Sequence, residues 1–222
     1  MTVLHLADEG EAADLAAFLS RLLHYDRGAA VRLQAAGTAL AVFGRPPSFE
    51  VLAVRAVRLA KPYEDGLDVT LDVTVSAGEL LESVDEKGAT AVVPGAVTGP
   101  PWAGVLPPRG GWRPEPGLPA PDTLRSLVAA AVAEFRSRTQ ELPPERRTRA
   151  ELDGIGRDIW SRTVGDTRLP VRAVHAAQSL GFLRPEVQPA LFASGAWLRL
   201  RTPYGSVAVR QAGLGALDVS VR

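Results

Sequence analysis

A stretch rich in proline and glycine, residues 94–121, constrains the fold of this chain more than any other feature. Its 28 residues contain 9 of the 18 prolines and 6 of the 21 glycines in a chain of 222. Proline lacks the backbone N–H that a helix interior or a central strand needs, so the stretch is expected to be neither. We therefore expect an α+β sheet domain over 1–93, a packed loop or linker over 94–121, and a helical plus β-hairpin domain over 122–222.

The first region has the periodicities of one long helix and a mostly antiparallel sheet. Apolar residues recur at helical spacing over 15–23 and predict the helix. Strands are expected over 2–6, 29–34, 38–43, 50–60, 67–75 and 89–93. Arg55 and Arg58 mark expected exposed positions of the fourth strand. Asp68 and Asp72 lie on the polar side of an alternating strand, so a solvated face is favoured over a pair of catalytic carboxylates.

Three helices and a β-hairpin are expected in the second region. The first helix is expected to follow Asp122, the second to be capped by Thr148, and the third to have Pro170 in its first turn. The hairpin is expected to pair 196–201 with 206–210. Residues 217–221 could add one more strand. The whole chain is thus predicted to be α+β, with an N-terminal, mostly antiparallel sheet and one long helix, then a three-helix segment followed by a β-hairpin.

Several kinds of catalytic and metal chemistry have no basis in the sequence. The absence of cysteine excludes disulfides, thiolate metal sites and a cysteine nucleophile. His5, His24 and His175 are far apart, and none has a second ligand at helical spacing. Gly154-x-Gly156 lacks the third glycine of a dinucleotide fingerprint. We expect no cofactor, no metal and no catalytic residue, and lean towards a protein that is not an enzyme.

Charge is unevenly distributed along a chain whose formal net charge is zero. Residues 1–111 have 9 basic and 14 acidic side chains, whereas residues 112–222 have 16 and 11. All but Lys61 and Lys87 among the cations are arginines. No apolar run approaches the ~20 residues of a membrane helix, and residues 1–11 have acids where a signal peptide has bases. We expect a cytoplasmic protein without a membrane partner.

Nucleic acid is one expected class of partner. Three helices followed by a hairpin is the order of the later elements of a winged helix-turn-helix. Residues of the third helix and the hairpin could then contact bases or phosphates; these are Arg172, His175, Arg199, Arg201 and Arg210. The alternative is a helical subdomain on a sheet whose arginines reflect a GC-rich genome.

The proline-rich loop suggests two further hypotheses. It carries Trp102, Arg109 and Trp112, and a free linker is normally more polar than this one. In the first-ranked hypothesis the chain is a non-enzymatic interaction module, and the loop presents aromatic side chains to an unidentified protein partner or to a second copy. In the other, the loop covers the pocket of a small-ligand protein or an enzyme.

Two resemblances to known proteins complete the sequence evidence. The order of elements over 1–93, with the segment Val75-Ser76-Ala77-Gly78-Glu79-Leu80-Leu81, resembles one repeat of a bacterial DNA-polymerase sliding clamp. That resemblance implies a fold for the first region, but not a processivity function, which needs a closed basic ring. Short segments around Phe18, Thr98 and Ile159 are similar to those of uncharacterised actinobacterial proteins, a resemblance that implies an origin but no activity.

Overall fold

An eight-stranded antiparallel sheet runs through both halves of the chain. The structure, a computed structural model, describes residues 2–60 and 71–211. The strand order in the sheet is β5-β2-β3-β4-β10-β9-β8-β7. The strands are β2 (Ala30–Ala36), β3 (Ala39–Gly44), β4 (Leu52–Arg58), β5 (Asp72–Ser76), β7 (Arg113–Pro114), β8 (Ala190–Ser194), β9 (Trp197–Thr202) and β10 (Gly205–Arg210). A second, two-stranded sheet pairs β1 (Val3–His5) with β6 (Thr90–Val92).

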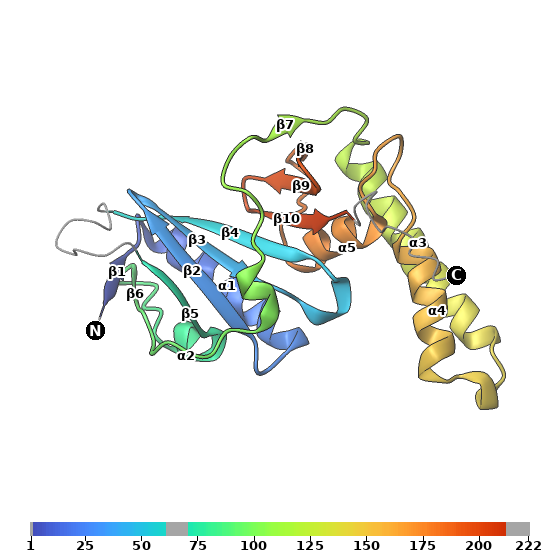
Figure 1. Cartoon of the computed structure of the whole chain (residues 1–222), viewed down its shortest axis with the longest axis horizontal. Helices are drawn as coiled ribbons and strands as arrows, with labels where there is room; N and C mark the ends of the chain where they lie inside the picture. Colours follow the sequence, from blue (N-terminus) through green and yellow to red (C-terminus); the bar gives the residue numbers. More distant parts are fainter. Residues whose placement is uncertain (1, 61–70, 212–222) are drawn as a thin grey trace, which may run out of the picture.

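Helices cover one face of the large sheet. The combination of helices with antiparallel sheets confirms the predicted α+β class. The helices are α1 (Glu9–Tyr25), α2 (Ala77–Glu82), α3 (Pro121–Glu141), α4 (Arg149–Trp160) and α5 (Val171–Ser179). Both predicted capping residues, Ser76 and Thr148, accept a backbone N–H at 3.3 Å. The helices α3 and α4 lie side by side and extend away from the sheet (Figure 1).

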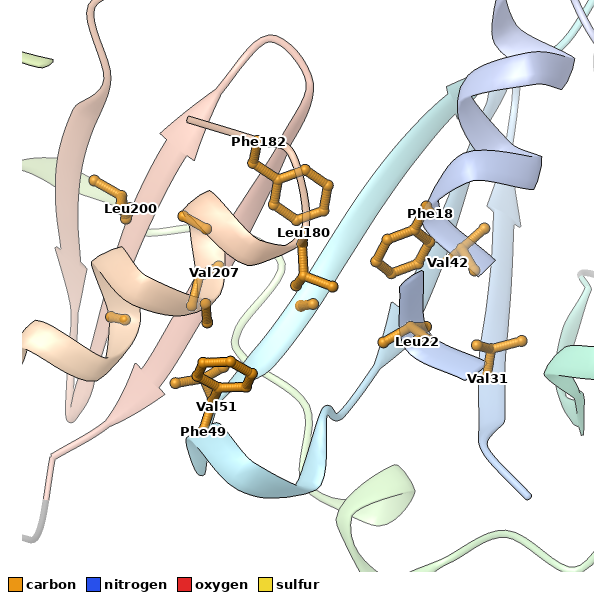
Figure 2. Close-up of a cluster of buried hydrophobic side chains, with 14 of the residues drawn as sticks. Phe18, Leu22, Val31, Val42, Phe49, Val51, Leu180, Phe182, Leu200 and Val207 are labelled. Carbon is orange, nitrogen blue, oxygen red and sulfur yellow. The ribbon is translucent and has the colours of Figure 1, made fainter. Parts of the chain in front are cut away.

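The two halves join where β4 pairs with β10. Leu52, Ala53 and Val54 of β4 lie opposite residues 208, 207 and 206 of β10. The core on the helical side is one continuous cluster that includes buried residues of α1, β4, α5 and β10. Phe18 of α1 stacks on Phe182 at 5.7 Å between ring centroids, and Figure 2 shows side chains of both halves within this core. The two halves therefore share one sheet and one hydrophobic core.

Arg55 provides a polar connection between the halves. The sequence predicted an exposed side chain at this position, and that prediction was wrong. Its side chain is only 6% exposed, whereas Arg58 is 70% exposed, as the sequence predicts. The Arg55 guanidinium donates to Glu11 at 3.1 Å and Asp14 at 3.0 Å, both in α1, and to the carbonyl oxygen of Tyr204 at 2.7 Å. A buried guanidinium needs such acceptors, and the sequence pattern of β4 does not reveal them.

The proline-rich stretch crosses the face of the sheet that the helices leave uncovered. It leaves the β5 edge, where the N–H of Val97 donates to the carbonyl of Thr74 at 2.9 Å. It reaches the other edge as β7, where the N–H of Glu115 donates to the carbonyl of Leu191 at 2.8 Å. Figure 1 shows this path as the green segment between α2 and β7. We call the face that it crosses the outer face.

Two short strands, β7 and β8, were not predicted, and one expected strand lies outside the described residues. The sequence reasoning treated residues before 196 as loop, but Ala190–Ser194 forms β8 and pairs with β9. Two prolines just before it, Pro185 and Pro189, hide this short strand in the sequence. The expected strand at 217–221 and Asp68 are not among the described residues.

The shared core predicts that a change in the first half destabilises the second. Arg55→Ala leaves Glu11, Asp14 and the Tyr204 carbonyl with fewer partners and should lower the free energy of unfolding by about 2–3 kcal/mol. Three of the four tryptophans, Trp112, Trp160 and Trp197, lie in the second half, so tryptophan fluorescence during urea unfolding reports mainly on that half. In Arg55→Ala, the urea midpoint measured by fluorescence and the midpoint measured by circular dichroism should fall by the same amount. Arg149→Ala is the control, because that side chain is 94% exposed. An unchanged fluorescence midpoint in Arg55→Ala would show that the halves unfold independently.

Candidate functional site

Alternation along β9 and β10 places arginine and tryptophan side chains together on the outer face. Directly opposed residues of antiparallel strands share a face, and Trp197 lies opposite Arg210 while Arg199 lies opposite Ala208. Ala208 is also the partner of Leu52 in β4, so the row continues into the first half. The intervening residues, such as Leu198 and Val207, are buried in the core on the helical side.

A hollow of about 360 Å³ opens on the outer face at the junction of the two halves. Its lining comes from three separate parts of the chain: Arg45, Glu50, Val51 and Leu52; Pro101, Trp102 and Val105; and Trp197, Ala208 and Arg210. We call it the outer-face hollow. Beside it, Trp102, Leu106 and Trp197 pack on a small buried cluster that contains Leu52 and Ala208. The hollow therefore has apolar and aromatic walls, with two arginines and one glutamate among its lining residues.

The turn that carries Trp102 is held in place by β2. Residues Pro101–Gly104 form a 3₁₀ turn, and the guanidinium of Arg32 donates to the carbonyl oxygen of Ala103. The same guanidinium donates to Asp72 at 2.7 and 3.0 Å, and Gln34 donates to that carboxylate at 3.1 Å. The pKa of Asp72 is lowered chiefly by the hydrogen bonds from Arg32. Arg32 is thus held by Asp72 while it holds the turn, which fixes one wall of the hollow.

The arginines near the hollow have little compensating negative charge. Among the described residues, Arg45, Arg201 and Arg210 form no ion pair. Arg199 donates to the hydroxyl of Ser206 at 2.9 Å, and its pKa is lowered by burial and by the positive charge of Arg201. This part of the outer face is therefore prepared to receive an anionic group.

The other two residues singled out in the loop lie outside the hollow. Trp112 donates its indole N–H to the carbonyl of Pro108 at 3.0 Å, and its ring lies 5.7 Å from the Arg199 guanidinium carbon. Arg109 is exposed, and its charge contributes to the lowered pKa of Asp72. Only Trp102 of the three loop residues lines the hollow.

Arg172 and His175 belong to the opposite, helical side of the sheet. The helix α5 packs on β9 and β10 there, and α3 and α4 contact it as well. The imidazole of His175 stacks on Trp160 at 4.6 Å and meets the ring of Phe49 edge-on at 5.0 Å. Arg172 is half-buried, and its Nε has no hydrogen-bond partner among the described residues. The five residues proposed for nucleic acid therefore form two groups on opposite faces, and only Arg210 lines the hollow.

Eight of the ten lining residues are not among the site residues predicted from the sequence, which include only Trp102 and Arg210. Arg45 and Glu50 gave no signal, because nothing in the sequence places their segment beside the loop and the hairpin. Trp197 did give one, since it alternates with Arg199 and Arg201 on one face of the predicted hairpin. Over the described ranges no group of three or more His, Asp or Glu side chains could hold a metal ion. No helix within those ranges is long and apolar enough to cross a membrane.

Comparisons with known proteins match both parts of the chain to domains without an assigned function. Residues 1–104 match the family model "Domain of unknown function (DUF8010)", and residues 107–214 match "Domain of unknown function (DUF8185)". No curated protein matches the sequence. The boundary between the two matches falls just after the turn that carries Trp102. The outer-face hollow is therefore lined by residues of both matched domains.

One solved structure to which the chain is similar is the beta subunit from DNA polymerase of Streptococcus pyogenes. The similarity has a TM-score of 0.49 and 10% sequence identity, and it covers 88% of this chain and 62% of that chain. The chain thus spans less than two thirds of that subunit. A likeness at this TM-score supports no inference about function.

The environment of His175 predicts a pH-dependent contribution to stability. Burial lowers the pKa of His175, so the unfolded chain binds the proton more readily than the folded one. The contribution of His175 to the free energy of unfolding is complete above its pKa in the unfolded chain, about 6.5. That contribution is lost as the pH falls through this value towards the lower pKa in the folded chain. Urea unfolding at several pH values should show this loss in the wild type but not in His175→Phe, which keeps an aromatic ring. His24→Gln, a change at an exposed position, should retain it; a His175→Phe profile that matches the wild type would refute the prediction.

Proposed function

We propose that this protein is a non-enzymatic binding module and that a segment of a partner protein docks in the outer-face hollow. The observation that supports this proposal is the composition of the hollow. Two tryptophans and several apolar side chains make its walls, and arginines flank it. Aromatic and arginine side chains on a rigid base are typical of the residues that contribute most to protein–protein binding.

The position of the hollow also supports a binding role. Its base belongs to two hydrogen-bonded strands, β4 and β10, and its Trp102 wall is fixed by the Arg32 hydrogen bond to Ala103. Binding sites at the junction of two domains that rest on a sheet are largely formed before the partner arrives. A preformed site loses less conformational entropy when it binds, which favours affinity from a small contact area.

A peptide selection tests this function. A random peptide library displayed on phage should yield sequences that bind the full chain, and Trp197→Leu, which removes the indole but keeps an apolar side chain, should weaken their binding. Trp160→Leu is the matched control, because Trp160 lies on the helical side against His175. Both variants must keep the wild-type circular dichroism spectrum. Selected peptides that bind Trp197→Leu as tightly as the wild type would exclude the hollow as the docking site.

Nucleic-acid binding is the second candidate, and one observation favours it. Arg199, Arg201 and Arg210 share the outer face with Trp197, and arginines beside an aromatic ring are a common feature of single-strand binding surfaces. Arg172 and His175 would take no part, since they lie behind the sheet.

This second function makes a separate prediction about salt. A fluorescently labelled single-stranded oligonucleotide should gain anisotropy with the full chain at low ionic strength, and the affinity should fall steeply as salt is added. Arg201→Ala should weaken the binding, because that arginine is exposed on the proposed surface. No binding at low ionic strength would remove this candidate.

A further inference from the structure

We infer that the segment which docks in the outer-face hollow is acidic, with one bulky apolar side chain inserted between the tryptophans and carboxylates on the arginines around it. This inference rests on the proposed function and goes beyond it by naming the chemistry of the partner. Three features of the hollow lead to it: its volume, the walls that receive the apolar group, and the charge that surrounds them.

The volume and the walls define the apolar anchor. About 360 Å³ lies near the lower end of the ~300–1,000 Å³ typical of ligand pockets. Such a space suits one large side chain better than a long stretch of chain. Trp102 and Trp197 are half-buried beside it, and Val105 is 48% exposed, which is unusual here because the described residues include few large apolar side chains so exposed. A bulky apolar side chain would cover this surface and remove it from water.

The surrounding charge defines the rest of the segment. Arg45 and Arg210 line the hollow, and neither has a carboxylate partner among the described residues. Arg201 and Arg199 continue the positive surface along β9, where their mutual repulsion contributes to the lowered pKa of Arg199. Carboxylates placed here would relieve that repulsion and could form paired hydrogen bonds with the planar guanidinium groups. Complementary charge also speeds association and selects the partner.

Glu50 favours a peptide over a nucleic acid as the occupant. It lines the hollow together with Arg45 and Arg210, and its negative charge is unfavourable to a nucleic acid, which carries a phosphate on every unit of its backbone. A peptide backbone, by contrast, offers N–H groups that can donate to its carboxylate. Single-strand binding also needs a row of aromatic rings available for stacking. Trp112, the remaining tryptophan on this side, already lies near Arg199 and donates to Pro108.

Four labelled probes test the inference with the full chain. The first is the acetylated peptide Glu-Glu-Leu-Phe-Glu-Glu. The second replaces both Leu and Phe with Ala, the third replaces every Glu with Gln, and the fourth is a short single-stranded oligothymidine. Fluorescence anisotropy should show binding of the first peptide, and each of the other probes should bind at least about tenfold more weakly.

Variants of one arginine show whether charge selects the peptide. Arg210→Ala should weaken the first peptide about tenfold, whereas Arg136→Ala, on the exposed side of α3, should leave it unchanged. Arg210→Glu should reverse the preference, so that a peptide with Lys in place of each Glu binds better than the acidic one. A variant that merely failed to fold would bind neither peptide, so a reversed preference cannot arise from misfolding.

The outcomes separate this inference from the proposed function. If the Gln peptide binds as well as the Glu peptide, or if selected peptides bind the hollow without acidic residues, the inference is overturned and the proposed function stands. If no peptide binds and the selection also yields nothing that depends on Trp197, both are overturned. Tighter binding of the oligothymidine than of the acidic peptide would overturn the inference in favour of a nucleic-acid partner.

Discussion

The antiparallel pairing of β4 with β10 is the interaction on which the rest of the structure depends. It joins strands that are about 150 residues apart in sequence, and it converts two smaller sheets into one. On the helical side it brings α1 and α5 onto a common core, where Phe18 meets Phe182. On the outer side it sets Leu52 beside Ala208 as part of the floor of the outer-face hollow. Neither matched domain contains the complete hollow, so the proposed binding surface requires both of them.

The two faces of this sheet differ in the segments that cover them and in the side chains that they carry. The helical face is closed by α1 and α5 and contains the buried Arg55 and the stacked His175. Within the part of the chain that the structure describes, the proline-rich stretch crosses the outer face and leaves apolar surface around Trp102 and Trp197, beside arginines that form no ion pair there. Proline suits this crossing because the stretch lies flat on a completed sheet and needs few backbone donors. The proline-rich stretch, whose prolines prevent regular structure, thus places the aromatic side chain of Trp102 over the junction of β4 and β10.

The sequence predicted the local structure well because local patterns determine it. Helical spacing identified α1, alternation identified the polar and apolar sides of β5, and Ser76 and Thr148 marked two helix starts. It failed where partners are distant: the acceptors of Arg55 lie in α1 and in the hairpin, and β8 became a strand by pairing with β9. Of the candidate site residues, Trp102 and Arg210 line the hollow, but the sequence treated them as members of different sites. Only the pairing of β4 with β10 shows that they share one.

Mapping a bound peptide on the folded chain tests most directly whether the two halves together form the binding site. With a labelled protein and the acidic phenylalanine peptide, amide chemical shifts in two-dimensional nuclear magnetic resonance spectra would be followed during a titration. If both halves form the site, the shifts should change together, with one dissociation constant, at Glu50–Leu52, at Trp102–Val105 and at Ala208–Arg210. Changes confined to one of the two matched domains, or centred on α5 behind the sheet, would contradict it.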